Sequence, residues 1–418
     1  MRKISFSLRV YLFLSFIIDP IYLVYQYISV LRGKESLARF WERWVNKKIY
    51  RPSGKLIWFH AASVGEALSV IPLIQKLVKE DQEVNILITS TTMTSAQIFE
   101  KKPFCRVIHQ MAPHDTFFVS KRFLTHWKPD LAIRVESEIW PRILLELKKN
   151  NTPNFLFNAR FSKKTLLKIR QQAKSSAFLL SLFDCIHVQE SSTKKILSKV
   201  GVAVQKISVT GSLKDSRGKL PVDKNELKKF KKVIGSQKVW LAASIHPGED
   251  EVILAAHKKI GGILLIAPRH IERAKQIAKL SRSLGFNTQL RSEEPDIKTE
   301  TAVYIADTMG EMGLWYSLTS VAFIGGSLVD KGGHNPVEVA QFNTYILHGP
   351  NTYNALEKYE QLSQAGICFL VKNESELVKE IIRFQNLRKK LNVDLTTLFD
   401  PEYALKEAFN EIKLITNS

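Results

Sequence analysis

The stretch from residue 56 to residue 90 reads LIWFHAASVGEALSVIPLIQKLVKEDQEVNILITS. It opens with a short apolar run, LIWFHAA, which ends at the turn Ser63-Val64-Gly65. The next segment, EALSVIPLIQKLVKE, carries apolar residues at helical spacing, and VNILITS is a second apolar run. A strand, a helix and another strand in this order are typical of a parallel sheet covered by helices.

The same alternation continues on both sides of one polar segment. Further strands are predicted at residues 106–112, 131–137, 154–160, 185–190 and 206–212. A second series of predicted strands begins with VWLAAS at residue 239 and continues at residues 263–269, 287–292, 301–307, 320–326, 344–349 and 367–371. Residues 213–238 lie between the two series and predict a linker with a basic helix, and residues 374–418 predict a helical end. We therefore expect an α/β protein with two similar Rossmann-like halves that face each other across a cleft.

This pattern predicts three parts along the chain. Residues 1–50 form a membrane anchor and basic segment, residues 51–220 an N-terminal Rossmann-like domain, and residues 221–418 a C-terminal Rossmann-like domain with terminal helices. The length of 418 residues, with 45% hydrophobic and 24% charged residues, excludes a disordered or fibrous protein. Only three cysteines occur, at positions 105, 185 and 368, and they form no CxxC pair. A disulfide framework or a zinc ribbon is therefore not expected, and a reducing compartment fits better.

The chain is strongly basic, with 61 Lys and Arg residues against 40 Asp and Glu residues and a formal charge of +21. Such a field favours an anionic partner: nucleic acid, an anionic membrane surface or a phosphorylated substrate. Residues 10–31 read VYLFLSFIIDPIYLVYQYISVL and are flanked by basic residues on both sides. We expect this segment to seat the chain on a membrane. The alternative is a pair of buried core helices broken at Asp19-Pro20.

Acidic residues follow two predicted strands of the first half. Glu66 lies in the first turn of a helix, where a carboxylate can act as a general base or simply stabilise the positive helix end. Glu136 and Glu138 lie at the end of the strand predicted at residues 131–137. Paired acids can bind sugar hydroxyls, hold a cation or share a proton, and the alternative is helix capping ahead of Trp140-Pro141. No third oxygen ligand stands at a spacing that supports Mg²⁺.

Four clusters follow strands of the second half, at residues 244–249, 267–270, 307–311 and 325–338. Arg269 can bind a phosphate through two hydrogen bonds from its guanidinium group. In the last cluster four glycines precede Asn335 as an N-cap and Pro336 at the first helical position, an arrangement that binds anions. Glu338 alternatively completes a capping box with Asn335. Together the clusters predict a nucleotide site, while the absence of GxGxxG and GxxxxGK[ST] from these loops disfavours a dinucleotide fold or a P-loop.

Many of these residues occur in segments that resemble those of a known family. The segments HAASVGEALSVIPLI, VESEIWP, NARFS, VTGSLK, AASIHPGEDE, APRHIER, DTMGEMGLWY, FIGGSL and GGHNPVE occur in order from about residue 55 to residue 355. Together they resemble the 3-deoxy-D-manno-octulosonic acid (Kdo) transferases of lipopolysaccharide synthesis. The resemblance implies a GT-B glycosyltransferase that moves Kdo from CMP-Kdo to a lipid A precursor, with inversion, at the cytoplasmic face of the inner membrane.

The same resemblance implies roles for individual residues. Residues 51–220 would bind the acceptor and residues 221–418 the CMP-Kdo donor. Glu66 would accept the proton, and Glu136 and Lys214 would stabilise the transition state. The implied CMP contacts are Pro268, Arg269, Met309, Gly310, Glu311, Asn335, Pro336, Val337 and Glu338. No metal and no other cofactor is implied, since His60, His246, His270 and His334 also lack a metal-ligand spacing.

Two other functions compete with this one. A sugar-nucleotide epimerase, or another GT-B glycosyltransferase, would explain the nucleotide clusters but not the anchor or VESEIWP. A nucleic-acid-binding protein would explain the charge of +21, but no recognised binding module is present in the sequence. We therefore expect no nucleic acid partner.

Overall fold

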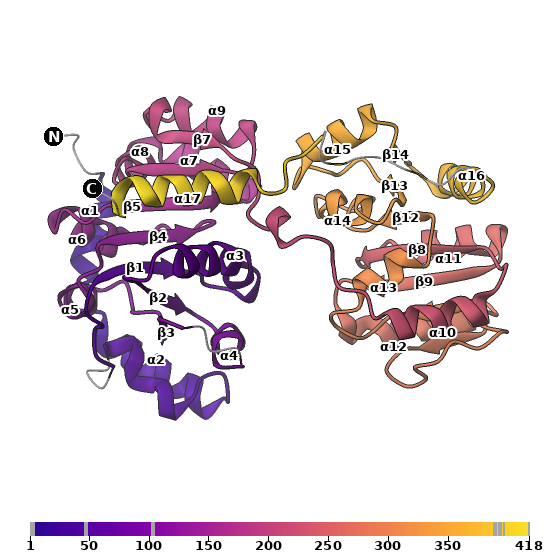
Figure 1. Cartoon of the computed structure of the whole chain (residues 1–418), viewed down its shortest axis with the longest axis horizontal. Coiled ribbons are helices and arrows are strands. Elements are labelled where there is room, and N and C mark those ends of the chain that lie inside the picture. Colours follow the sequence, from indigo (N-terminus) through magenta and orange to yellow (C-terminus); the bar gives the residue numbers. More distant parts are fainter. Residues whose placement is uncertain are drawn as a thin grey trace. The chain divides into compact units, whose positions relative to one another are not determined.

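The computed structural model describes residues 5–45, 49–101, 105–387, 391, 395 and 398–416, and the chain divides into two compact units (Figure 1). The first unit consists of Met1–Arg217 and Pro401–Ser418, and the second of Gly218–Asp400. The last residues thus return to the first unit, whereas the sequence analysis grouped residues 221–418 together. The reason is packing: Ala404, Ala408 and Ile412 are buried in the core of the first unit.

The first unit is built on a seven-stranded parallel sheet with the strand order β3-β2-β1-β4-β5-β6-β7. Its strands are β1 (Lys55–His60), β2 (Val84–Ser90), β3 (Val107–Met111), β4 (Leu131–Val135), β5 (Asn154–Ala159), β6 (Cys185–Val188) and β7 (Ile207–Val209). Every strand predicted for this half is confirmed. The central strands are buried on both faces, which is why they read as continuous apolar runs rather than as alternating ones.

Helices cover both faces of this sheet. They are α3 (Val64–Glu80), α4 (Met93–Lys101), α5 (Phe117–Trp127), α6 (Pro141–Lys149), α7 (Lys163–Gln171), α8 (Ala173–Ser181), α9 (Ser191–Lys199) and α17 (Tyr403–Thr416), with the short 3-10 helices η1 (Leu37–Trp44), η2 (Val204–Lys206) and η3 (Asp215–Arg217). Alternate residues of β1 face opposite layers: Ile57 and Phe59 share a core with α3 and α17. Leu56 and Trp58 share another core with α5 and α6.

The second unit repeats the plan with the parallel strand order β10-β11-β9-β8-β12-β13-β14. Its strands are β8 (Val239–Ile245), β9 (Ile263–Pro268), β10 (Thr288–Leu290), β11 (Val303–Ile305), β12 (Val321–Ile324), β13 (Tyr345–His348) and β14 (Cys368–Leu370). Its helices are α10 (Lys224–Ile234), α11 (Asp250–Ile260), α12 (Ala274–Ser283), α13 (Met312–Ser317), α14 (Pro336–Ala340), α15 (Leu356–Gln364) and α16 (Glu374–Gln385), with the 3-10 helix η4 (Ile271–Arg273). All strands predicted for this half are present, and α10 is the predicted basic helix. The predicted helical end is two separate helices, α16 and α17.

The N-terminal segment forms two helices, α1 (Phe6–Leu14) and α2 (Asp19–Leu31), which are bent by 69° at the break between them. Pro20 lies in the first turn of α2, where a backbone N–H would have no acceptor within the helix. The missing N–H of proline therefore costs no hydrogen bond there, and proline favours a helix start. In the described part of the chain, no helix alone has the length and apolar character needed to cross a bilayer, and this bent pair meets those criteria only jointly. In α1 and α2 the buried residues are only Leu8, Gln26 and Ser29, so the pair is not a buried core element.

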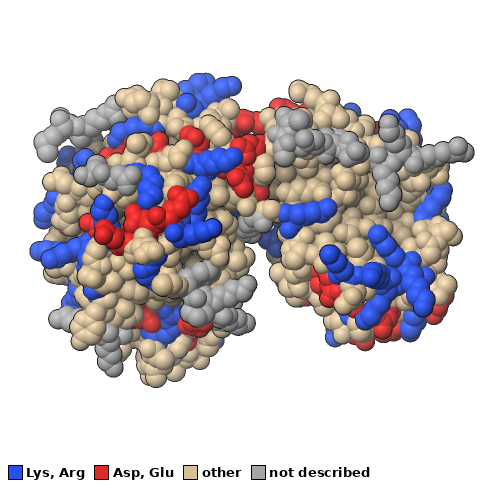
Figure 2. Space-filling model, viewed as in Figure 1, with Lys and Arg blue, Asp and Glu red and all other residues tan. Residues whose placement is uncertain are grey.

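Basic side chains gather over α10 in the second unit, as Figure 2 shows. The exposed lysines of this helix are Lys224, Lys228, Lys229, Lys231 and Lys232. Its apolar residues Phe230 and Ile234 face inward and join the core of the unit. The helix is therefore amphipathic and contributes a large share of the positive charge of its face.

Candidate functional site

Glu66 lies at the start of α3, directly after the carboxyl end of β1. The helix is capped by Ser63, whose Oγ accepts the backbone N–H of Glu66 at 3.3 Å. In return, Glu66 Oε1 accepts the hydroxyl of Ser63 at 2.9 Å, and Oε2 accepts the backbone N–H of Ala62 at 2.8 Å. The alternative considered for Glu66, stabilisation of the helix start, is therefore present in the structure, and the residue is only 8% exposed.

Burial changes the acid–base behaviour of this carboxyl. Loss of solvent raises the pKa of Glu66 to about 7, and the negative charges of Glu136 and Glu138 act in the same direction. The hydrogen bonds from Ala62 and Ser63 oppose the shift without cancelling it. A carboxylate with this pKa can accept a proton near neutral pH, which is the property that a general base requires.

Glu136 and Lys214 lie beside Glu66 and come from two other loops. Glu136 follows β4 and has a φ of 61°, in the left-handed region that non-glycine residues rarely adopt. Its Oε1 accepts Lys214 Nζ at 2.6 Å and Asn158 Nδ2 at 3.4 Å. A Cβ placed on Gly65 would lie 4.0 Å from Lys214 Nζ, so the ammonium group reaches the loop that carries Glu66. The structure thus brings the three predicted residues together at one sheet edge.

Glu138 has different partners from Glu136. Its Oε2 accepts Trp140 Nε1 at 2.8 Å and lies 3.3 Å from His60 Nε2. Behind this group Arg134 is almost fully buried, with its guanidinium carbon 4.8 Å from the ring centre of Trp58 and 5.5 Å from that of Trp140. Among the described residues its guanidinium nitrogens have no hydrogen-bond partner. Arg134 was not predicted as a site residue, because in the sequence it is one polar residue within an apolar strand.

The two carboxylates after β4 do not cap α6, which corrects one alternative considered for them. Asp115 supplies the cap instead: its carboxylate oxygens accept the backbone N–H groups of Arg142 at 3.1 Å and of Ile143 at 2.8 Å. Asp115 comes from the segment between β3 and α5, far away in the sequence. Glu136 and Glu138 are therefore left to contact Lys214, His60 and Trp140.

In the second unit, Glu249 connects two of the predicted clusters. Its fully buried carboxylate accepts four backbone N–H groups: those of His246 at 2.9 Å, Gly326 at 2.8 Å, Ser327 at 3.1 Å and Leu328 at 3.1 Å. Gly326 has a φ of +69°, and a Cβ on it would lie 3.1 Å from the ring of His246. The loop after β8 and the glycine loop after β12 therefore pack tightly against each other.

Cationic groups surround this junction. His246 Nε2 lies 2.9 Å from His334 Nε2, and the two rings are stacked with centres 5.2 Å apart. His270 approaches His246 edge-on, with ring centres 5.9 Å apart. Burial lowers the pKa of His246, and the charges of His270, Lys331, Arg269 and Arg273 lower it further. Arg269 itself is exposed, directly after the buried Pro268 at the end of β9. This concentration of positive charge suits an anionic ligand.

The segment 335–338 starts the short helix α14. Asn335 caps the helix by accepting the backbone N–H of Val337 at 3.2 Å, and Pro336 is the first helical residue. Both features were predicted from the sequence. Pro336 and Val337 are buried, whereas Asn335 and Glu338 are partly exposed.

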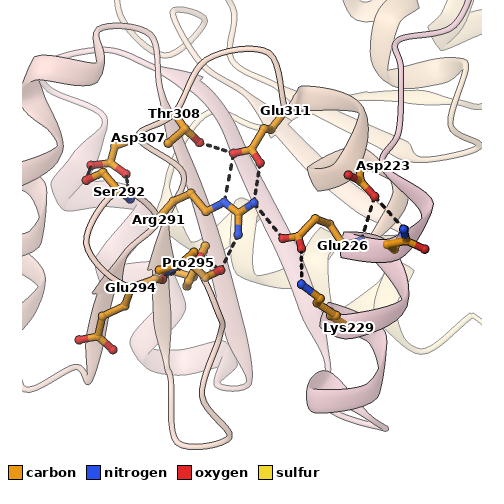
Figure 3. A network of polar contacts seen from close by, with 12 residues as sticks. Asp223, Glu226, Lys229, Arg291, Ser292, Glu294, Pro295, Asp307, Thr308 and Glu311 are labelled. Carbon is orange, nitrogen blue, oxygen red and sulfur yellow. Dashed lines mark hydrogen bonds and ion pairs between the residues drawn. The ribbon is translucent and has the colours of Figure 1, made fainter.

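A polar network holds the turn at residues 307–311 (Figure 3). Arg291 donates to Glu311 through two nitrogens, at 3.2 and 2.6 Å, and to Glu226 of α10 at 2.9 Å. The hydroxyl of Thr308 also donates to Glu311. These contacts hold the pKa of Glu311 below its usual value, although burial acts against them. The Glu311 carboxylate is thus bound by the protein, while Met309 is 78% exposed and Gly310 has a φ of +90°.

Comparisons with known proteins agree with this arrangement. Residues 38–217 match the family model described as "3-Deoxy-D-manno-octulosonic-acid transferase (kdotransferase)". The chain is 34% identical over 378 residues to the 3-deoxy-D-manno-octulosonic acid transferase of Rickettsia bellii (strain RML369-C), with 89% of each chain covered. The chain belongs to the 3-deoxy-D-manno-octulosonic acid transferase family. It is therefore a glycosyltransferase, as the resemblance predicted.

Further relatives in the family come from distant organisms. One from Haemophilus influenzae (strain ATCC 51907 / DSM 11121 / KW20 / Rd) is 29% identical, with 91% of this chain and 92% of the relative covered. A probable mitochondrial 3-deoxy-D-manno-octulosonic acid transferase from Arabidopsis thaliana is 32% identical, with 86% and 83% covered.

Solved structures show that the fold is of the GT-B type. A glycosyltransferase from Rickettsia africae ESF-5 aligns with a TM-score of 0.62 at 13% identity, covering 87% of this chain and 99% of that one. A putative UDP-N-acetylglucosamine 2-epimerase from Listeria monocytogenes aligns with a TM-score of 0.59 at 13% identity, covering 88% and 98%. At these identities the likeness concerns the fold alone. The family relationship therefore favours the transferase over the epimerase alternative.

Proposed function

We propose that the chain transfers Kdo from CMP-Kdo to a hydroxyl group of a lipid A precursor, with inversion at the anomeric carbon. The observation that carries this proposal is Glu66, a buried carboxyl with a pKa of about 7 beside the Lys214–Glu136 ion pair. Sugar transfer needs a base for the incoming hydroxyl and positive groups for the departing phosphate. The first unit offers the base, and the cationic junction of the second unit offers the positive groups.

Glu66 acts as the general base in this proposal. As the acceptor oxygen forms its bond to the anomeric carbon of Kdo, its proton passes to the Glu66 carboxylate. The bond between that carbon and the phosphate oxygen breaks, and CMP leaves with the electron pair. One direct displacement of this kind inverts the configuration at the anomeric carbon. The hydrogen bonds from Ala62 and Ser63 would hold the carboxylate in position during the transfer.

Glu136 and Lys214 stabilise the transition state in this proposal. Positive charge develops on the sugar ring while negative charge develops on the departing phosphate. A carboxylate and an ammonium group 2.6 Å apart offer one charge of each sign without reorganisation. The left-handed backbone at Glu136 is consistent with a residue held in place for function, since such strain persists only where the surroundings enforce it.

The donor nucleotide would bind at the carboxyl ends of the second sheet. Arg269 and the pair His246–His334 would contact the two anionic groups of CMP-Kdo, its phosphate and its carboxylate. Met309 and Gly310 would contact the nucleotide through the exposed turn, while Glu311 positions that turn through Arg291. Residues 335–338, at the capped start of α14, would complete the site together with Pro268 at the end of β9.

We also propose that the chain sits on the cytoplasmic face of the inner membrane. The packing of α2 supports this placement, because its exposed apolar residues include Ile21, Val24, Tyr25 and Ile28, at the spacing of one helix face. The opposite face buries Gln26, whose Nε2 donates to the backbone oxygen of Phe40 at 2.8 Å. A helix that buries a glutamine and exposes its apolar residues is stable when the exposed face contacts lipid and not water.

The lipid-facing character extends beyond α2. Trp41 of η1 is 62% exposed, and a groove of about 560 Å³ beside it is lined by Leu23, Trp44 and Arg122 among others. Tryptophan and arginine are side chains that suit the boundary between lipid and water. The overall positive charge would add attraction to anionic lipids and to a phosphorylated acceptor.

Mass spectrometry of reaction products tests the proposed function. Purified full-length protein is incubated with CMP-Kdo and a lipid A precursor in mixed micelles. The proposal predicts a lipid product heavier by Kdo and release of CMP. A parallel incubation with UDP-N-acetylglucosamine tests the epimerase alternative, and conversion of that sugar without Kdo transfer would overturn the proposal.

A further inference from the structure

A cluster of three metal-binding side chains lies on the first sheet, away from the groups proposed for catalysis. Cys185 and His187 are alternate residues of β6, so their side chains point to the same face of the sheet. That face is covered by α17, which lies along the first sheet in Figure 1 and carries Glu411. Cys185 Sγ, a ring nitrogen of His187 and a carboxylate oxygen of Glu411 all lie within 4.8 Å of one another.

The histidine of this cluster needs a partner. His187 is only 2% exposed, and its Nδ1 has no hydrogen-bond partner among the described residues. Its ring is held by stacking on Phe157, with ring centres 4.6 Å apart. Buried polar atoms in folded proteins are nearly always paired, so this nitrogen marks a place where an ion or a water molecule can bind.

We propose that Cys185, His187 and Glu411 bind one transition-metal ion, with Zn²⁺ as the best match. Sulfur, imidazole nitrogen and carboxylate oxygen are the three donor types that Zn²⁺ takes in proteins, at about 2.0–2.3 Å from the metal. Donor atoms around such an ion are roughly 3.3–3.8 Å apart, so side-chain movements of about 1 Å bring the three donor atoms to binding distance. A water molecule would complete the four ligands.

The charges around the site favour a cation. Burial and then the negative charges of Glu411 and Asp184 raise the pKa of the Cys185 thiol, and the same negative charges attract a metal cation. Metal binding requires the thiolate, so the thiol proton leaves to solvent as the metal–sulfur bond forms. No oxidation or reduction takes part in this exchange.

The site would be structural. The segment before α17 belongs to the second unit, and α17 packs on the first through apolar contacts of Ala404, Ala408 and Ile412. A metal ion shared by β6 and Glu411 would fasten this returning helix to the sheet. No metal was expected from the sequence, because a ligand set of one Cys-x-His pair and a distant Glu has no recognisable spacing.

The chain offers a matched control for testing this site. Cys368 is also a buried thiol on a strand, but it lies in the second unit and belongs to no such cluster in the described part of the chain. Cys105 is exposed, so all proteins carry Cys105→Ser to remove adventitious binding. Metal-free full-length protein, Cys185→Ser and Cys368→Ser are titrated with Co²⁺, whose absorption reports a thiolate ligand, and then with Zn²⁺ in competition. His187→Gln serves as a second variant.

The expected result is one Co²⁺ per chain with a sulfur-to-metal absorption band, displaced by Zn²⁺. Cys185→Ser and His187→Gln should weaken binding by more than about tenfold, since loss of mere supporting groups already costs 10- to 100-fold. Cys368→Ser should bind as the parent does. Zn²⁺ should also raise the melting temperature of the parent but not of Cys185→Ser. Absence of the sulfur band in the folded parent, or equal binding by Cys185→Ser, would overturn the proposal.

Discussion

Lys214 Nζ lies 2.6 Å from Oε1 of Glu136, which joins the loop after β7 to the loop after β4. Both side chains are partly exposed, so the pair is open to a ligand rather than locked in the core. Glu136 also acts electrostatically on Glu66, where it favours the protonated form. The charges of Lys214 and Glu136, proposed to stabilise the transition state, are therefore coupled to Glu66, the proposed base.

The first prediction concerns this ion pair. Lys214→Met and Glu136→Gln should each lower turnover by about 10- to 150-fold, the range for a hydrogen bond to a charged group of about 1.5–3 kcal/mol. The double variant should lose less than the product of the two losses, because the residues act as a pair. Steady-state kinetics of Kdo transfer measures all three.

Lys206→Met is the matched control for Lys214→Met. Lys206 also lies in the first unit, and within the described part of the chain its ammonium group donates to the backbone oxygens of Ser181 and Phe183. Its loss should reduce stability but leave turnover nearly unchanged. Full multiplication of the losses in the Lys214 and Glu136 double variant would contradict the paired role.

The second prediction concerns Glu249. Glu249→Gln replaces one acceptor oxygen with an NH₂ group, which cannot accept the backbone N–H groups bound there now. Unfolding free energy should fall by about 1–3 kcal/mol, the cost of unpaired buried polar groups, and CMP affinity should fall because the glycine loop loosens. Denaturant unfolding and calorimetry measure the two effects. The exposed Glu251, changed to Gln, should alter neither, and a stable Glu249→Gln protein with full CMP affinity would argue against this positioning role.

The third prediction is a proton uptake on CMP binding. The free protein holds His246 largely neutral at pH 7, since burial and neighbouring cations lower its pKa. A bound phosphate favours the charged imidazole and raises that pKa, so binding takes up protons between the free and the bound pKa. CMP affinity should therefore rise as the pH falls through the bound pKa. Calorimetry in buffers of different ionisation enthalpy measures the uptake, which His246→Ala should abolish.

The fourth prediction concerns the phosphate contact of Arg269. Arg269→Ala should weaken CMP binding by about 1.5–3 kcal/mol, the range for a hydrogen bond to a charged group. Lys275 is an exposed cation on the neighbouring helix α12, and Lys275→Ala tests whether loss of charge alone suffices. Calorimetry that finds equal CMP affinity in the parent and in Arg269→Ala would remove Arg269 from the donor site.

The sequence predicted the strands and most helices correctly, because the spacing of apolar residues and the local composition determine where these elements form. Continuous apolar runs such as LIWFHAA mark strands buried on both faces, and Asn335 followed by Pro336 marks a helix start. The position of α17 could not be predicted in this way. The spacing of its apolar residues predicts a helix but not whether that helix packs on the core of the first unit or of the second.

The candidate site was predicted less completely. Glu66, Glu136 and Lys214 were singled out through family motifs, and the structure brings them together. Spacing alone could not pair Lys214 with Glu136, since they are far apart along the chain. Glu249 was noted within a cluster without a role, because its task is to bind the backbone of another loop.

The most direct test of the account is the rate of Kdo transfer by Glu66→Gln, followed by mass spectrometry of the lipid product. The amide nearly matches the carboxylate in size, so the melting temperature and CMP affinity should stay close to those of the parent. Glu80→Gln is the matched control, since Glu80 is an exposed glutamate at the other end of the same helix α3. Loss of the base should reduce turnover by roughly 10²–10⁴-fold in Glu66→Gln alone. Turnover within about threefold of the parent, or a loss matched by Glu80→Gln, would contradict Glu66 as the general base.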